Sequence, residues 1–113
     1  MSDGSPIKAA RIRELNDQLR FKAIGGRIVI TRGIQALGAD DLRAVLLAVA
    51  RFDDFSEDND PWGEHDCATL TVDGHRLIFK IDYYDRDLAY HSPAASDPAV
   101  TERVLTVMLA EEY

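Results

Sequence analysis

The sequence predicts an α+β domain in which about three helices cover a small antiparallel sheet. Two observations carry this prediction: apolar residues recur at helical spacing in three segments, and two alternating segments flank an Asp-Gly pair at residues 73 and 74. The chain has 113 residues, of which 46% are hydrophobic, which is enough for one domain with its own core. We expect a flexible tail over residues 1–6 and a single domain over residues 7–113.

The N-terminal half predicts two helices and a strand. Residues 7–22 repeat apolar side chains at helical spacing, and Gly25-Gly26 ends the pattern. The apolar, β-branched run 27–31 predicts a strand. A connection over residues 33–38 leads to a second helix over residues 40–52, which begins with two aspartates and is apolar nearly all round. We therefore expect this second helix to be the buried, central one.

A β-hairpin is the strongest local prediction. Asp73-Gly74 suits a two-residue type I′ turn, in which both residues need a positive φ. The turn fixes the register, because a two-residue loop leaves one pairing in which apolar residues meet. The expected pairs on one face are Val72–His75, Leu70–Leu77 and Ala68–Phe79, and on the other Thr71–Arg76, Thr69–Ile78 and Cys67–Lys80.

The C-terminal third predicts a polar connection and a third helix. Residues 85–96 are polar and turn-prone, with a short strand expected near residues 88–90. Asp97 followed by Pro98 is typical of a helix start. We expect this helix to continue to Tyr113 with an apolar stripe, which comprises Val100, Val104, Val107 and Met108.

Charge is distributed unevenly along the chain. The formal net charge is −7, with nine Lys/Arg against five Asp/Glu in residues 1–51, and four against fifteen in residues 52–113. An acidic surface of this kind attracts basic partners and repels phosphate backbones and membranes, so we expect no direct nucleic-acid binding and no membrane association. The single cysteine, Cys67, allows no disulfide within the chain and favours a cytoplasmic location.

The acidic stretch 53–66 is the main candidate for a working surface. It holds seven Asp/Glu and no Lys or Arg, and it leads directly into the hairpin. We expect it to be a loop that binds a partner, with a tryptophan as an apolar anchor and further carboxylates from the segment after the hairpin. The candidate partner-binding residues are Asp53, Asp54, Glu57, Asp58, Asp60, Trp62, Glu64, Asp66, Asp82, Asp85 and Asp87.

A catalytic alternative centres on His65. If the hairpin register continued past Cys67, His65 would lie opposite Asp82, with Glu64 nearby, and a His–Asp pair can orient an imidazole for acid–base chemistry. The alternative to this catalytic role is that His65 and Asp82 only pair across the sheet or cap a loop. We favour this structural role because no nucleophile motif accompanies the pair. The spacing does not predict a metal site: Thr69 stands where a calcium loop that began at Asp58 would need its closing glutamate. No cofactor motif is present in the sequence.

Three segments carry a family resemblance: residues 59–66 (Asn-Asp-Pro-Trp-Gly-Glu-His-Asp), 80–85 (Lys-Ile-Asp-Tyr-Tyr-Asp) and 103–113. From Arg27 to its C-terminus the chain resembles a family of short alphaproteobacterial proteins with a domain of unknown function, often encoded on plasmids and other mobile elements. The resemblance implies no catalytic residue. The mobile-element context that it implies suggests an inhibitor of a host defence complex, of the CRISPR or restriction kind.

The sequence thus favours an interaction protein over an enzyme. Its carboxylates would occupy positions on a basic partner that otherwise hold phosphates, with an attraction that weakens as salt rises. A homodimer that associates through the hairpin edge or the last helix is a third hypothesis.

Overall fold

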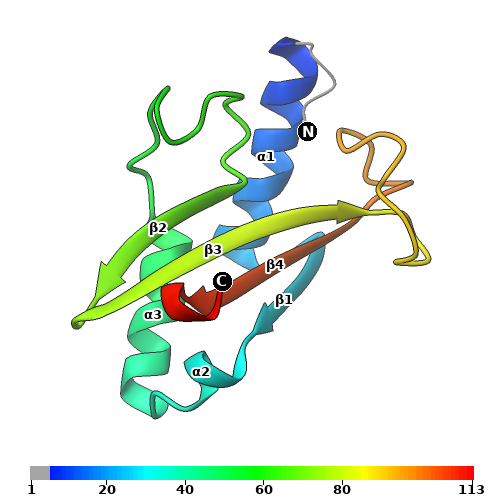
Figure 1. The fold of residues 1–113 in the computed structure, drawn as a ribbon. Helices are drawn as coiled ribbons and strands as arrows, with labels where there is room; N and C mark the ends of the chain where they lie inside the picture. Colours follow the sequence, from blue (N-terminus) through cyan, green and yellow to red (C-terminus); the bar gives the residue numbers. More distant parts are fainter. Residues whose placement is uncertain (1–5) are drawn as a thin grey trace.

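The computed structural model describes residues 6–113 and shows an α+β fold with helices on one face of a four-stranded sheet (Figure 1). The tail expected over residues 1–6 lies outside the described residues except for Pro6, which begins the first helix. The elements are α1 (Pro6–Lys22), β1 (Gly26–Ile30), α2 (Arg32–Gln35), α3 (Ala39–Arg51), β2 (Cys67–Val72), β3 (His75–Tyr84), β4 (Glu102–Leu109) and the 3-10 turn η1 (Ala110–Glu112).

The sheet is mixed, with strand order β1-β4-β3-β2. β4 lies antiparallel to β3 and parallel to β1. The hairpin register is confirmed at all six pairs, from Val72–His75 to Cys67–Lys80. Asp73 and Gly74 have φ values of 50° and 83°, as the predicted turn requires.

The third helix was predicted wrongly, because the segment after Asp97 forms strand β4. Asp97 accepts a hydrogen bond from the Ala99 amide in a turn and caps no helix. Burial along the segment alternates with period two: Arg103, Leu105 and Val107 are buried and the residues between them are less so. The strand expected near residues 88–90 is also absent there, and a single bridge pairs Tyr84 with His91 instead.

The two long helices were predicted at their observed positions, but the second is less buried than expected. α3 buries Val45 and Val49 while Leu46 and Leu47 are exposed. The connection that precedes it contains the short helix α2. No helix within residues 6–113 is long and apolar enough to cross a membrane.

The core lies between the sheet and the two long helices. Its buried apolar side chains come from the strands and from all three α-helices, and α1 contributes Ile12, Leu15 and Leu19. Gly26 is needed for the close approach of β1 to β4, because a Cβ there would lie 2.5 Å from the Arg103 carbonyl oxygen. The core residues with no exposed surface are Ile12, Leu19, Ile34, Val45, Leu77, Phe79 and Val107.

Candidate functional site

The predicted acidic residues divide into an exposed set and a buried set. Asp53, Asp54, Glu57 and Asp58 are exposed on the segment 53–66, which we call the acidic loop. Asp60 and Glu64, by contrast, are only 7% and 1% exposed, so they do not form part of the exposed surface of the loop. Asp66 is half-buried. Burial raises the pKa of Asp66, and the neighbouring carboxylates of Glu64 and Asp60 raise it further.

Uncharged groups hold the first half of the acidic loop together. The Asn59 side chain accepts a hydrogen bond from the Ser56 amide (2.7 Å) and donates one to the Asp54 carbonyl (2.8 Å). The Asp60 amide donates to the Ser56 carbonyl. Because amide groups and carbonyls make these bonds, the exposed carboxylates are left free to face solvent.

Side chains of α1 fasten the second half of the loop. Arg13 donates from Nη1 to the Gly63 carbonyl (2.8 Å), and Asn16 donates from Nδ2 to the Glu64 carbonyl (3.0 Å). His65 completes the attachment, since its Nδ1 lies 3.0 Å from Asp17 Oδ1. Basic, amide and acidic side chains of α1 thus each make one contact with the acidic loop.

His65 does not pair with Asp82. A φ of 56° at His65 turns the chain away from the hairpin, so the strand pairing stops near Asp66. The ring stacks on Phe55 with centroids 3.9 Å apart, and its Nε2 lies 3.7 Å from Asp60 Oδ2. Asp82 instead contacts Lys80 on the sheet face away from the helices. Both imidazole nitrogens thus face carboxylates, an arrangement typical of a cross-link between α1 and the loop.

A buried polar network beneath the loop was missed by sequence reasoning. Arg103, Asn16 and Tyr83 are at most 3% exposed. Asn16 accepts from Arg103 Nε (2.9 Å) and donates to the Tyr83 hydroxyl (2.8 Å), which in turn donates to Glu64 Oε1 (2.9 Å). Burial lowers the pKa of Arg103 and raises that of Tyr83. A charged side chain such as Arg103 is normally predicted to face solvent. Only its place in the alternation of β4, where it shares a face with Leu105 and Val107, indicates a buried position.

A second buried arginine joins the two long helices. Arg20 donates from Nη1 to the carbonyls of Val49 (2.9 Å) and Phe52 (2.7 Å) at the C-terminal end of α3. It also pairs with Asp17 at 3.0 Å, and its guanidinium lies over the Phe55 ring. Arg20 therefore satisfies helix-end carbonyls and orients the aspartate that contacts His65.

Trp62 is an exposed large hydrophobic side chain within the acidic loop, at 59%. Its indole therefore does not pack into the core, and its role as a partner-binding anchor stays a prediction. The remaining predicted residues lie apart from the loop. Asp85 and Asp87 belong to the connection after β3, on the other side of α1 in Figure 1.

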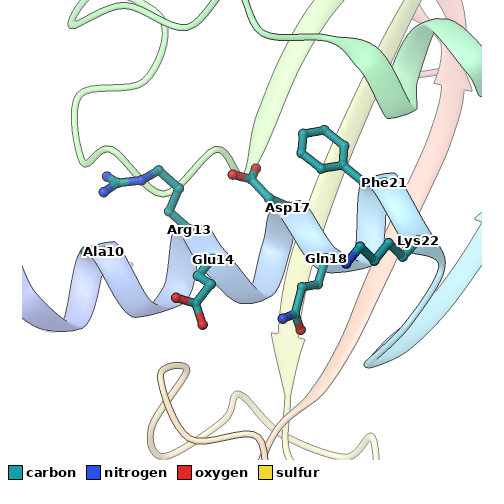
Figure 2. Close-up of a pocket in the computed structure, with 7 residues that line it drawn as sticks. All are labelled: Ala10, Arg13, Glu14, Asp17, Gln18, Phe21 and Lys22. Carbon is teal, nitrogen blue, oxygen red and sulfur yellow. The ribbon is translucent and has the colours of Figure 1, made fainter.

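An open hollow of about 440 Å³ lies along α1 beside the loop. In Figure 2, Arg13, Asp17 and Phe21 project toward the loop side of the helix, whereas Glu14 and Gln18 project the opposite way. Cationic and anionic side chains line the hollow together, so it has no charge preference. Residues 6–113 contain no group of three or more His, Cys, Asp or Glu side chains placed to hold a metal ion.

Comparison with protein families gives one match. The model of the family described as "Protein of unknown function (DUF3768)" covers residues 30–112. The chain belongs to this family. Neither the search of curated proteins nor that of solved structures found a match.

The DUF3768 segment does not include α1, although α1 completes its core and its site. The family match contains the acidic loop, Tyr83 and Arg103, whereas Asn16 and Asp17 precede it. The contacts from Asn16 to Glu64 and from Asp17 to His65 therefore cross the boundary of the matched segment. In this chain the helix is an integral part of the site.

Proposed function

We propose that the protein is an interaction module that binds a basic protein surface through the acidic loop. One observation carries the proposal: four exposed carboxylates, those of Asp53, Asp54, Glu57 and Asp58, lie on a loop that has no Lys or Arg of its own. Exposed carboxylates gathered in this way produce a local negative potential, which steers a cationic partner and selects against anionic ones.

Trp62 supplies the apolar component of the proposed interface. An exposed tryptophan at the edge of a charged surface is the kind of side chain that dominates binding energy once it is desolvated. The carboxylates would govern the rate of association and the choice of partner, and the indole would slow dissociation.

The attachment of the loop favours binding. The contacts from Arg13, Asn16 and His65 hold its second half against α1 before any partner arrives. A loop that is ordered in advance loses less conformational entropy on binding than a flexible one does.

For the partner, we propose a nucleic-acid-binding protein complex, with the carboxylates in positions that otherwise hold phosphates. The protein would then act as an inhibitor, because its loop and the nucleic acid would compete for one surface. A host defence complex is the partner that the mobile-element context of the resembling proteins suggests.

The test is affinity capture with three forms of the protein as bait. The first is the unmodified chain, and the second carries Asn or Gln at the four exposed loop positions. The third, matched in charge, carries the substitutions Asp40→Asn, Asp73→Asn, Asp97→Asn and Glu111→Gln, all at exposed positions away from the loop and outside the predicted partner-binding set. We expect the first and third baits to capture the same basic protein and the second to lose it.

Two additional measurements make the test specific. Capture is expected to fall steeply as salt rises, and double-stranded DNA is expected to release the captured protein. The interaction proposal fails if the loop variant captures as much as the unmodified chain. If salt releases the captured protein but DNA does not, the proposal that the loop binds a basic surface stands and the proposal that it mimics phosphates is rejected.

A further inference from the structure

The outer edge of β1 is apolar and exposed. Ile28 and Val29 are 41% and 44% exposed, and no strand within residues 6–113 pairs with this edge. Edge strands in soluble proteins commonly carry protective features such as lysine, proline or a bulge. In β1 the only charged residue is Arg27, whose Nε lies 3.3 Å from Glu102 on the adjacent strand.

The direction of the backbone groups along β1 follows from two contacts. The Thr31 amide donates to the Val107 carbonyl of β4, so the backbone N–H and C=O groups of Thr31 point toward β4. Those of Val29 and Arg27, at two-residue intervals, point the same way. The intervening residues point outward. A side-chain contact agrees with this, because Gln35 Nε2 reaches the Ile30 carbonyl from outside the sheet at 3.3 Å. The peptide groups of Gly26 and Ile28 thus face away from β4.

We propose that a second copy of this chain pairs with β1 through an antiparallel β1–β1 contact centred on Ile28. A two-fold axis at Ile28 brings Ile28 opposite Ile28 of the second copy and Gly26 opposite Ile30. Because the outward-pointing residues are the ones aligned, each outward amide meets an outward carbonyl, and the two four-stranded sheets become one of eight strands. The Ile30 carbonyl, which accepts from Gln35 Nε2, has a second lone pair for the Gly26 amide of the second copy.

The side chains favour a second copy as the occupant. On the helix-covered face the symmetric register places isoleucine against isoleucine and Gly26 against a larger residue, Ile30. On the other face Arg27 lies opposite Val29, so no like charges oppose one another and the aliphatic stem of Arg27 can cover the valine. The guanidinium can keep its contact with Glu102 of its own chain.

The other edge of the sheet suits such pairing less well. The residues of β2 that are exposed are Cys67, Thr69 and Thr71, and the acidic residues Asp66 and Asp73 flank the strand. Two copies of β2 would bring these carboxylates together. The proposed contact therefore lies at β1 and not at the hairpin edge expected from the sequence. The last helix, which was the other expected contact, is strand β4 in the structure.

The proposed dimer leaves the acidic loops free. β1 and β2 are the two outer strands of the sheet, and the acidic loop leads into β2 (Figure 1). Two loops would consequently lie at the far ends of the eight-stranded sheet, where they could bind two basic sites. The dimer does not depend on the proposed function, since its test needs no partner.

Proline substitutions at neighbouring positions test the dimer. Ile28→Pro removes an outward amide and is tolerated at a free edge, whereas Val29→Pro removes an amide that points to β4. By sedimentation equilibrium over a wide range of concentrations, the unmodified chain should reach twice its 12.6 kDa mass. Ile28→Pro should stay at the mass of one chain and keep the unmodified circular dichroism spectrum, while Val29→Pro should lose urea resistance.

Disulfide trapping provides a second measurement that does not require proline. Hydrogen-bonded antiparallel pairs have Cα atoms about 5.5 Å apart, which a disulfide can span. In a Cys67→Ser background, Ile28→Cys should form a covalent dimer under mild oxidation, and Thr69→Cys on the β2 edge should not. A chain that stays monomeric at every concentration, or that cross-links at residue 69 in preference to residue 28, would overturn the proposal.

Discussion

Asn16 on α1 donates a hydrogen bond from Nδ2 to the hydroxyl of Tyr83 on β3, 2.8 Å away. The same side chain accepts from Arg103 Nε on β4. One amide group therefore connects the helix to both central strands. The three side chains are buried, so none of these polar groups can turn to water if the amide is removed.

Replacement of Asn16 is expected to destabilise the fold strongly. Asn16→Ala leaves the Arg103 guanidinium and the Tyr83 hydroxyl each short of a buried partner, and we expect a loss of about 2–4 kcal/mol in the free energy of unfolding. Urea denaturation followed by circular dichroism measures it. Gln18→Ala, on the exposed side of the same helix, should change the value by less than about 0.5 kcal/mol. Equal losses for the two variants would show that the network contributes nothing.

Removal of α1 should prevent the family-matched segment from folding. Ile12, Leu15 and Leu19 are at most 8% exposed, and each buried side chain of this kind contributes about 1.5–3 kcal/mol. That sum approaches the whole stability of a small domain, about 5–15 kcal/mol. A chain of residues 26–113 is therefore expected to lack a cooperative urea transition. A sharp transition at the midpoint of the full chain would contradict this.

The hairpin could be predicted pair by pair because its information is local. Turn chemistry and alternating residues on both sides of Asp73-Gly74 determine the register, and no distant contact alters it. α1 and α3 were likewise visible as helical apolar patterns. The α+β class follows from these segments alone.

The C-terminal strand and the site depend on contacts between distant residues. Arg103 occupies a core position of β4 and so interrupts the alternation of apolar and polar residues that would predict a strand. Val100, Val104 and Val107 meanwhile lie at the spacing of an apolar helical stripe. The buried Arg103 guanidinium donates a hydrogen bond to Asn16, which lies 87 residues earlier in the sequence. The partner of His65 is equally remote, since Asp17 is 48 residues away on α1. A single sequence offers no signal for such pairs.

Neutralisation of Asp66 is expected to stabilise the protein at neutral pH. Burial, and then the nearby carboxylates of Glu64 and Asp60, raise the pKa of Asp66 above its ordinary value of 3.8. A raised pKa means that the folded state binds the proton more tightly, so the contribution to stability is present below pH 3.8 and is lost as pH rises through the folded value. Asp66→Asn should therefore unfold at higher urea than the unmodified chain at pH 7, and the advantage should vanish in acid. The exposed Asp58→Asn should show no comparable change.

The Cys67 thiol is expected to react slowly although the residue is exposed. Partial desolvation of the thiol by the surrounding protein, followed by the carboxylates of Asp66 and Asp60, raises the pKa of the thiol above its ordinary 9.0. Because the thiolate is the nucleophile, alkylation by iodoacetamide near pH 8 should be slower in the folded protein than in urea. Asp66→Asn should speed the folded reaction without changing the unfolded rate. Identical folded rates for the two chains would show that Asp66 does not influence the thiol.

Glu112 should support the fold at neutral pH and lose that role in acid. Its carboxylate accepts hydrogen bonds from the Thr31 hydroxyl (2.6 Å) and from the amides of Leu109 (2.8 Å) and Gly33 (3.0 Å), which tie η1 to the start of α2. These bonds lower its pKa below the ordinary 4.5. A lowered pKa gives stability that is present above pH 4.5 and is lost as pH falls through the folded value. Glu112→Gln should therefore lower the urea midpoint at pH 7 and converge with the unmodified chain in acid. Its exposed neighbour Glu111→Gln serves as the control, because a loss of equal size there would indicate a general charge effect and not this set of hydrogen bonds.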